Sequence, residues 1–382
     1  MDPTTDPTTD TTMDTTVRLA AGPVALRPFR TGDVDDIVLG CNDPLVQRFV
    51  PVPGPYTRDH AVDWITNQVP ADRAAGGIQL AIADPTTDRI LGAVGIQRVQ
   101  GTSAEIGYWV APWGRRRGAA TAATGALTAW AFQGRFTRLE LRTEPENGAS
   151  QRVALNAGYT RDGVLRGAGV ARDGSRVDLV CFTRLAGDPP GPVPRPLPDL
   201  PGGRLTDGVV TLRRVGPGDA DDIVAMRSLP DVYAAMVPAA PPNPAAVARA
   251  CAQADARWLE GTRAWMCVRD AATGAFAGEM GLHVTDPLSG EAMTGYSLTS
   301  AWRGKGYASR ALRLVADWAL GTAGVGRLTA GTDPGNTASQ RVLEAVGFTR
   351  EGRLRGRLVG ADGVRKDDLL YGLLPGDQRS RK

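Results

Sequence analysis

The sequence predicts two tandem domains of the α/β (α+β) class, each with a mixed β-sheet flanked by helices. Three observations support this prediction. The chain of 382 residues is longer than one hydrophobic core usually is. A segment of domain length is repeated within it. Strand and helix signals alternate along each copy, in a composition (42% hydrophobic, 22% charged) that is typical of globular proteins.

Two pairs of matching segments define the repeat. Val24–Val38 returns as Val210–Val224 with nine of fifteen positions identical, and Ser150–Gly167 returns as Ser339–Gly356 with eleven of eighteen identical. The offsets are 186 and 189 residues, so three residues of net insertion accumulate over a whole domain. Because solenoid repeats have periods of about 20–50 residues, this period indicates a duplicated domain.

The repeat also predicts where the domains begin and end. Gly187–Gly203 lies between the copies and contains seven prolines, which favour an extended chain, so we predict a semi-rigid linker over 188–203. The expected domains are 21–187 and 204–376. Residues 1–20 form the remaining segment, in which Met1–Thr16 carries only acidic charged side chains and no apolar core. That composition predicts a disordered tail and is unlike a secretory signal.

The elements of the second copy can be placed in order. Strand signals cover Val209–Arg213, Ala264–Arg269, Ala277–Val284, Thr294–Thr299 and Arg327–Thr332. Helical patterns begin at Asp219, Ala308 and Asn336. Asn336 is a good N-cap residue and Gly347 follows the end of its helix. The first copy has the same order of elements.

A glycine-rich basic segment lies between a strand and a helix in each copy. The two segments are Gly114–Ala120 (GRRRGAA) and Trp302–Ala308 (WRGKGYA), which share the pattern Arg-x-x-Gly-x-Ala. Small residues allow close backbone approach, and a helix start offers unpaired N–H groups, so this pattern suits a pyrophosphate. The same pattern is compatible with an ordinary turn. Arg115–Arg117 is also compatible with a run of charged side chains that are exposed to solvent.

A second motif follows the first by about 30 residues in each copy. Asn147–Tyr159 (NGASQRVALNAGY) matches Asn336–Phe348 (NTASQRVLEAVGF), with Asn-x-x-Ser at the start and a Gly-aromatic pair at the end. Helix capping alone explains the Asn and the Gly. The two motifs together, in this order, resemble the GNAT superfamily of N-acetyltransferases in its RimJ/RimL-like branch.

This resemblance covers nearly all of both copies and implies a mostly antiparallel, twisted sheet that binds acetyl-CoA as co-substrate. It implies that the glycine-rich turns hold the pyrophosphate, that a splayed strand (Ile106–Val110 and Thr294–Thr299) pairs with the pantetheine arm, and that an Asn binds CoA nearby. The binding residues expected on this basis are Val110, Arg115, Arg116, Arg117, Gly118, Ala120, Asn147, Leu298, Arg303, Gly304, Lys305, Gly306, Tyr307, Ala308 and Asn336.

The resemblance also suggests a general base. An alkylammonium with a pKa of about 10.4 is no nucleophile, so transfer to it needs a base that removes a proton. Many members of the family use a Glu on the splayed strand, and Glu105 occupies that place in the first copy. The second copy has Met293 there, for which Glu291 or Glu279 are the candidate substitutes.

A general acid is expected after the Asn. Other family members use a Tyr seven residues after it, but those positions are Ala154 and Leu343. In the RimJ/RimL-like branch a Ser three residues after the Asn takes this role, which points to Ser150 and Ser339. Both also fit plain first-turn helix residues.

The expected function is direct transfer of acetyl, in a ternary complex, to a primary amine of a small molecule or of a protein amino terminus. The alternative is that one or both domains are non-catalytic acyl-CoA-binding modules, which Met293 leaves open for the second copy. We see no metal-ligand spacing, Gly-x-Ser-x-Gly elbow or phosphate-binding P-loop in the sequence. Neither His60 nor His283 is expected to be catalytic.

The expected partners are acyl-CoA and an amine acceptor, without nucleic acid or membrane. A net charge of +3 is small for a nucleic-acid-binding chain, and no apolar stretch approaches the about 20 residues of a membrane span. The four cysteines lack CxxC spacing, which indicates reduced thiols in a cytoplasmic protein. We expect the domains to pack as an intramolecular pseudo-dimer, in a chain that is a monomer or homodimer overall.

Overall fold

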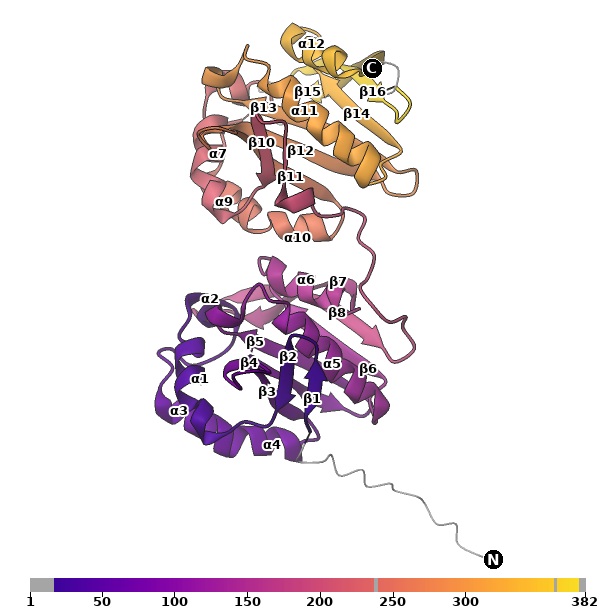
Figure 1. Cartoon of the computed structure of the whole chain (residues 1–382). Helices are drawn as coiled ribbons and strands as arrows, with labels where there is room; N and C mark the ends of the chain where they lie inside the picture. Colours follow the sequence, from indigo (N-terminus) through magenta and orange to yellow (C-terminus); the bar gives the residue numbers. More distant parts are fainter. Residues whose placement is uncertain (1–16, 237–239, 361–362, 378–382) are drawn as a thin grey trace, which may run out of the picture. The chain divides into compact units, whose positions relative to one another are not determined.

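The chain forms two compact units, Met1–Pro194 and Arg195–Lys382, in a computed structural model (Figure 1). The structure describes residues 17–236, 240–360 and 363–377. Most of the predicted tail, residues 1–16, therefore lies outside the described residues. The expected packing of the two domains as a pseudo-dimer stays a prediction.

The first unit contains a mixed sheet with the strand order β1-β2-β3-β4-β5-β6-β8-β7. All neighbours described in it are antiparallel except β5 and β6, which are parallel. The strands are β1 (Leu19–Ala21), β2 (Val24–Arg27), β3 (Ile78–Ala83), β4 (Ile90–Gln100), β5 (Ser103–Val110), β6 (Arg138–Thr143), β7 (Thr160–Val170) and β8 (Arg176–Leu185). The α-helices are α1 (Val34–Cys41), α2 (Pro44–Phe49), α3 (Arg58–Asp63), α4 (Val69–Ala74), α5 (Ala119–Gln133) and α6 (Gly148–Asn156).

The second unit repeats this topology with the order β15-β16-β14-β13-β12-β11-β10-β9, and β13 and β14 are its parallel pair. The strands are β9 (Arg204–Thr206), β10 (Val210–Arg214), β11 (Arg263–Asp270), β12 (Phe276–Asp286), β13 (Glu291–Leu298), β14 (Arg327–Thr332), β15 (Thr349–Val359) and β16 (Arg365–Leu373). The α-helices are α7 (Ala220–Arg227), α8 (Pro230–Tyr233), α9 (Pro244–Ala252), α10 (Ala254–Leu259), α11 (Tyr307–Asp317) and α12 (Thr337–Val346). The predicted fold, two tandem α/β domains with mixed, mostly antiparallel sheets and flanking helices, is confirmed.

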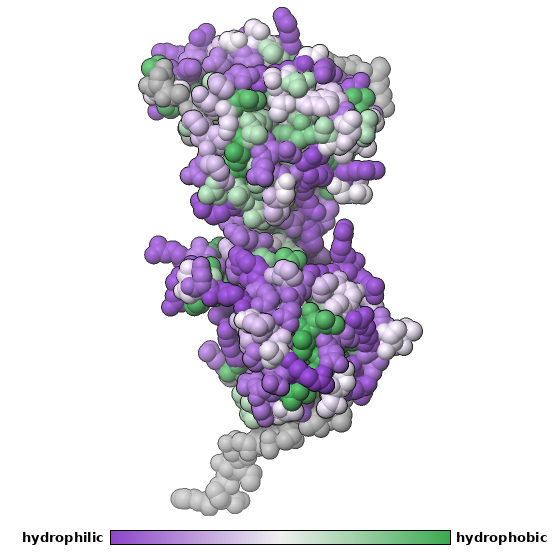
Figure 2. All heavy atoms as spheres, turned by 90° about the vertical axis from the view of Figure 1, so that its left-hand side faces the viewer, coloured by the Kyte–Doolittle hydropathy of each residue, from purple (hydrophilic) through white to green (hydrophobic). Residues whose placement is uncertain are grey.

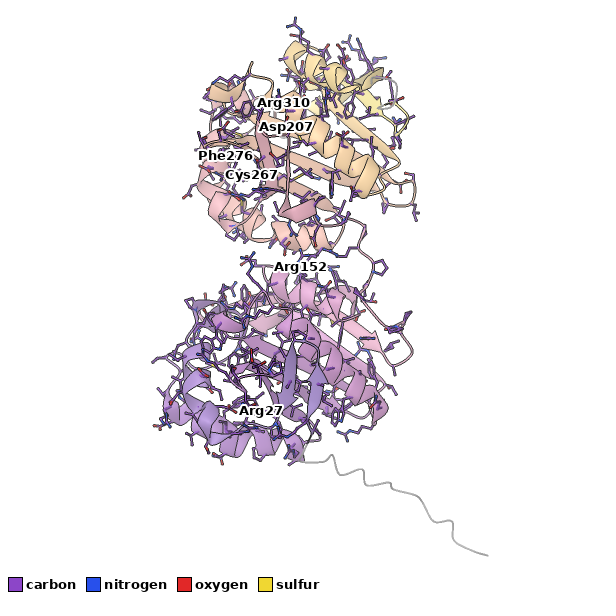
Figure 3. The ribbon with its side chains drawn as sticks, viewed as in Figure 1. Arg27, Arg152, Asp207, Cys267, Phe276 and Arg310 are labelled. Atoms are coloured by element: carbon purple, nitrogen blue, oxygen red, sulfur yellow. The ribbon has the colours of Figure 1, made fainter. Side chains whose placement is uncertain are left out.

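Helices cover both faces of the second sheet. Successive residues of a strand point to opposite faces, so they contact different helices. On one face Met280 of β12 packs with Val315 of α11 in a shared core. On the other face Cys267 of β11 (labelled in Figure 3) packs with Ile223 of α7 and Cys251 of α9. The helices of each unit thus sort into two layers, and this sorting decides which strand residues face the same side as the candidate site.

The repeated segment at the start of each copy is explained by an ion pair, which is buried in the first copy and joins a buried aspartate to a half-exposed arginine in the second. Arg27 of β2 (labelled in Figure 3) donates from Nη1 and Nη2 to the two carboxylate oxygens of Asp33, each at 2.8 Å. Arg213 of β10 pairs with Asp219 in the same way. Each pair joins a strand to the start of the helix that follows it, so the identity between the copies in this segment has a structural cause.

The proline-rich segment is not a free spacer along its whole length. The N–H of Val193 donates to the carbonyl of Leu155 in the first unit at 2.9 Å. Leu197 and Leu200 are only 1% and 3% exposed and belong to the core of the second unit. The indole of Trp258 donates to the carbonyl of Pro198 at 2.9 Å. The domain limits of 21–187 and 204–376 stay predictions. They place Leu197 and Leu200 in the linker, although both residues pack in the core of the second unit.

Hydrophilic residues cover most of the surface that Figure 2 shows, with hydrophobic residues in small groups between them. Among the helices that the structure describes, none is both long and apolar enough to cross a membrane.

Candidate active sites

The two parallel strands of each unit separate part-way along their length. β5 and β6 pair at Ser103–Arg138, Ala104–Leu139 and Glu105–Glu140, although β5 continues to Val110 and β6 to Thr143. β13 and β14 likewise pair at three positions, the last of them Met293–Thr329. Within the described residues no further pair joins either couple of strands. We call the last pair of each ladder the apex, and the unpaired backbone edges beyond it the splay.

Side-chain parity divides the residues around the first apex between two faces. Trp109 of β5 packs with the core that α1 covers. Glu105 and Gly107 have the same parity as Trp109 and therefore share that face. Tyr108 lies on the opposite face, which α5 and α6 cover, as its hydrogen bond to α6 also shows. We call these the Glu105 face and the Tyr108 face.

A tyrosine–serine pair connects the splayed strand to the next helix in both units. The Tyr108 hydroxyl donates to Ser150 Oγ at 2.9 Å, and Tyr296 Oη lies 3.0 Å from Ser339 Oγ. Burial raises the pKa of both tyrosines, so their hydroxyls stay protonated at neutral pH. Two hydroxyl groups therefore meet on the Tyr108 face and on its counterpart in the second unit.

Sequence reasoning missed these two tyrosines. It looked for a tyrosine in the helix, at Ala154 and Leu343, whereas the structure supplies one from the strand. A signal was present, because the dipeptide Gly-Tyr occurs at 107–108 and again at 295–296, in equivalent positions of the repeat.

The two expected CoA-binding asparagines are the N-caps of α6 and α12. Asn147 Oδ1 accepts from the N–H of Ser150 at 3.1 Å, and Asn336 Oδ1 accepts from the N–H of Ser339 at 3.0 Å. The amide nitrogen of each side chain has no hydrogen-bond partner in the part of the chain that the structure describes. Capping therefore leaves the amide nitrogen of each side chain available to a ligand.

Glycine residues begin the helices that follow the splayed strands. Gly118 and Gly306 are the N-caps of α5 and α11, with φ of 74° and 79° in the left-handed region that favours glycine. Neither helix has a side-chain hydrogen bond at its cap. The N–H groups of both first turns are therefore open to an anion, and the helix dipole favours one there.

Two of the expected pyrophosphate-binding arginines are already used by the protein. Arg115 Nε donates to the carbonyl of Val110 at 3.2 Å, and Arg303 Nε donates to the carbonyl of Leu298 at 3.0 Å. Each guanidinium also pairs with an aspartate of a neighbouring helix or cap. These arginines fix the turn to the end of the splayed strand, and Val110 and Leu298 supply the acceptor for that contact.

The other expected loop residues differ in their exposure and in whether they already contact other groups of the protein. Arg116, Arg117 and Gly304 are exposed, and the ammonium of Lys305 lies 5.3 Å from the ring centre of Trp302. The Tyr307 hydroxyl donates to Asp270 of β11. Ala120 and Ala308 are half-buried in the first turns. Exposed cations thus stand beside both helix starts.

Glu105 is held at the first apex by positive and polar groups. Its Oε2 accepts from Arg98 Nη1 at 2.7 Å and lies 3.8 Å from Arg142 Nε, while its Oε1 lies 3.4 Å from Gln97 Nε2. The side chain is 13% exposed. The carboxylate is therefore fixed in position with its charge neutralised, next to the last pair of the ladder.

Comparison with known proteins decides what this arrangement belongs to. A family model described as an acetyltransferase (GNAT) domain matches residues 24–160 and again residues 210–349. The chain belongs to the GNAT acetyltransferase family. The family and the tandem arrangement that the sequence predicted are confirmed.

Individual relatives cover only parts of the chain. Probable N-acetyltransferase YjcK of Bacillus subtilis is 40% identical over 89 residues, which are 23% of this chain and 49% of that protein. The chain thus spans about half the length of this curated relative. The ribosomal-protein-S5-alanine acetyltransferase of Vibrio fischeri is 23% identical, with 46% of this chain and 98% of that chain covered and a TM-score of 0.42. RimJ of Mycobacterium smegmatis, in complex with CoA-disulfide, is 27% identical over 45% of this chain and 84% of that chain, with a TM-score of 0.40.

The second GNAT domain has no carboxylate at its apex, and the expected substitutes differ in their surroundings. Both oxygens of Glu279 are occupied by Arg227, through Nε and Nη2 at 2.8 Å each, and by the indole of Trp265 at 2.8 Å. Glu279 is 7% exposed and both of its oxygens are bonded at 2.8 Å, whereas Glu105 Oε1 has only the 3.4 Å contact with Gln97, so Glu279 suits a structural role better than that of a base. Glu291 lies at the start of β13, two residues before Met293, with its carboxylate 3.6 Å from Arg327.

Glycines lie directly beyond the apex on the Glu105 face of both domains. Gly95 is opposite Gly107 in the first sheet, and Gly281 is opposite Gly295 in the second. A Cβ at Gly295 would meet no atom within 4 Å, and one at Gly281 would lie 3.6 Å from His283 Nε2. The backbone of the second domain is therefore bare beside its apex, in what we call the glycine hollow.

Proposed function

We propose that this chain transfers acetyl from acetyl-CoA to a primary amine, of a small molecule or of a protein amino terminus, by direct transfer in a ternary complex. The observation that carries the proposal is the apex of the first domain, with Glu105 on one face and the Tyr108–Ser150 pair on the other. A proton acceptor and a proton donor thus stand on opposite sides of the splay. Membership of the GNAT family supports acyl transfer as the reaction class.

Acyl-CoA would be held by groups that the protein leaves unpaired. The N–H groups at the starts of α5 and α11 suit the pyrophosphate, with Arg116, Arg117 and Lys305 adding positive charge. The open backbone edges of the splay suit the amide groups of the pantetheine arm. The free amide nitrogens of Asn147 and Asn336 would donate to the same arm.

The proposed chemistry in the first domain uses one residue from each face. Glu105 takes a proton from the acceptor ammonium, and the amine lone pair attacks the thioester carbonyl to form a tetrahedral intermediate. The intermediate collapses as the C–S bond breaks and the nitrogen loses its second proton. Ser150 donates a proton to the leaving sulfur and regains one, through water, from the nitrogen, and Glu105 then releases its proton to solvent. Because Tyr108 donates to Ser150 Oγ, the hydrogen of the serine is free to point at the sulfur.

The test uses the full chain, acetyl-CoA and a panel of primary amines that includes peptides with free amino termini. Release of CoA thiol that depends on the amine, together with an acetylated product detected by mass spectrometry, is the expected result. A chain that binds acetyl-CoA in a calorimeter but releases no CoA with any amine, or with a cell extract, would be a binding module instead.

A further inference from the structure

The sheet register places His283 beside the position of the missing carboxylate. In the first domain Gln97 of β4 is directly opposite Glu105 of β5. In the second domain His283 of β12 is directly opposite Met293 of β13 in the same way. Side chains of residues that are directly opposite in an antiparallel pair lie side by side on one face. His283 therefore lies on the face that corresponds to the Glu105 face, at the apex.

The imidazole of His283 extends toward the glycine hollow. A Cβ built at Gly281, two residues earlier on the same strand, would lie 3.6 Å from Nε2 and 3.8 Å from Cδ2 of His283. The corresponding Gln97 in the first domain reaches over Gly107, since a Cβ there would lie 3.3 Å from its Nε2. Both side chains thus lean over the bare backbone beyond the apex. The ring has no hydrogen-bond partner among the residues described.

Charged groups reach this histidine from three strands. Arg263 of β11 is directly opposite His283 on its other side. Glu279 of β12 lies on the same face four residues earlier, with its charge compensated by Arg227 of α7. Glu291 of β13 lies beyond Met293, near Arg327 of β14. Of these charges, the positive charge of Arg263 acts most directly on the imidazole of His283.

His283 is an exposed residue, and the partial desolvation of its ring by neighbouring protein atoms, together with the positive charge of Arg263, lowers its pKa from the usual 6.5. Neutral imidazole is thus the main form at pH 7, and it is the form that accepts a proton. A histidine with the ordinary pKa already suits acid–base catalysis near pH 7. The lowered pKa keeps the ring unprotonated, and so able to accept a proton, at more acidic pH as well.

We propose that the imidazole of His283 is the general base of the second domain and replaces the carboxylate that is absent at Met293. This inference rests on the proposed acetyl transfer. Nε2 takes one proton from the acceptor ammonium in the glycine hollow, and the freed amine attacks the thioester carbonyl. As the C–S bond breaks, Ser339 donates its proton to the sulfur and regains one, through water, from the nitrogen, which thereby loses its second proton. The imidazolium then returns its proton to water.

His283→Gln is the matched substitution, because it installs the residue type that the first domain has at this position. The background is the full chain with Gly118→Glu, which blocks the pyrophosphate turn of the first domain. A second background, Glu105→Gln with Ser150→Ala, guards against misfolding at Gly118. His60→Gln is the control, because His60 is the only other histidine in the chain and its Nδ1 accepts from the N–H of Thr57 in a helix cap.

In either background His283→Gln should lower kcat by about 10²- to 10⁴-fold at pH 7, with the affinity for acetyl-CoA unchanged. The loss should shrink as the pH approaches the pKa of the amine, since the acceptor then deprotonates by itself. His60→Gln should leave the rate unchanged. Adding Met293→Glu to His283→Gln recreates the Gln–Glu row of the first domain and should restore most of the rate.

Three outcomes overturn the inference. One is a pH–rate profile of His283→Gln that superimposes on that of its background, which leaves the proposed function intact. Another is a silent second domain in a chain whose first domain turns over. The third is a loss that is equal at all pH values and is not restored by Met293→Glu, which indicates a structural role. A wild-type chain without turnover on any amine would instead contradict the proposed function itself.

Nuclear magnetic resonance gives a readout that needs no acceptor. With two histidines, the ring C–H signals are assigned by the two single variants. Titration should give His283 a pKa below 6.5, and acetyl-CoA should shift its signals but not those of His60 in the Gly118→Glu chain. Signals of His283 that do not respond to saturating acetyl-CoA would place the ring away from the site.

Discussion

In the proposed reactions, single hydroxyl groups and a single ring nitrogen handle the protons in each domain. Tyr108 and Ser150 come from a strand and a helix that are 42 residues apart in the sequence, yet their oxygens lie 2.9 Å apart. Tyr296 and Ser339 repeat the contact at 3.0 Å. The serine has little preference for one hydroxyl rotamer on its own, so in the proposed mechanism the tyrosine orients its proton.

Tyr108→Phe should therefore lower kcat of the first domain while leaving the KM for acetyl-CoA unchanged. A net hydrogen bond contributes about 0.5–1.5 kcal/mol, so the expected loss is about 2- to 10-fold, smaller than that of Ser150→Ala. Steady-state kinetics in a chain with Gly306→Glu, which leaves only the first domain active, measures both constants. An equal loss in Tyr108→Phe and Ser150→Ala would make the tyrosine the proton donor itself.

Glu105→Gln keeps the size of the side chain but removes the base. In the same Gly306→Glu chain it should lower kcat at pH 7 by about 10²- to 10⁴-fold, and the deficit should narrow as the pH rises toward the pKa of the amine. The measurement is a pH–rate profile. An unaltered profile would show that water, and not Glu105, takes the proton.

At the scale of elements, the start of a helix forms the expected pyrophosphate site. The left-handed φ at Gly118 and Gly306 turns the chain from the strand into α5 and α11 without a side chain at the cap. Both helices then begin with open N–H groups, and Arg115 and Arg303 anchor the turn to the strand. The geometry depends on glycine because other L-residues are strained in this region.

Gly306→Ala should destabilise the second unit by about 1–2 kcal/mol through backbone strain, with little steric clash, since a Cβ there would meet nothing within 4 Å. Gly306→Glu should in addition place a negative charge at the anion site and abolish one acetyl-CoA site in calorimetry. Gly118→Glu should do the same for the first unit. Unchanged stoichiometry in both glutamate variants would refute the assignment of these turns.

The predictability of the site from sequence has a physical limit. The glycine-rich turns and the capping asparagines follow from local patterns, Glu105 follows from the family resemblance, and the expected strands agree with the observed ones to within a few residues. Tyr108 was missed, and His283 was expected not to be catalytic, because the roles proposed for them depend on what lies across the sheet. Such partners are set by register and by the point at which β5 and β6 part, which no local pattern contains.

At the scale of the whole chain, the segment between the copies belongs partly to the second fold. Leu197 and Leu200 fill its core, and Trp258 holds the carbonyl of Pro198. The abundance of proline masked these two leucines in the sequence, because composition predicts an extended chain but not what the chain packs against. The second unit therefore begins structurally before its first strand.

Leu200→Ala should destabilise the second unit by about 2–5 kcal/mol, as expected for a buried leucine, and leave the first unit unchanged. Leu288→Ala is the control, because Leu288 is 98% exposed. Thermal unfolding of the full chain, followed by hydrogen exchange in each unit, measures both effects. A small effect of Leu200→Ala, equal to that of Leu288→Ala, would mean that the segment is a spacer after all.

The splay also divides each sheet into two parts with few bonds between them. Three residue pairs join β5 to β6, and three join β13 to β14, across an otherwise continuous hydrogen-bonded ladder. We expect amide protons along the open edges to exchange in the free protein and to be protected when the pantetheine arm takes the place of a strand. The co-substrate would then be a structural component of the sheet. At a hundred times its dissociation constant it would stabilise a unit by about 2.7 kcal/mol, and amide exchange beyond each apex would slow in step with occupancy.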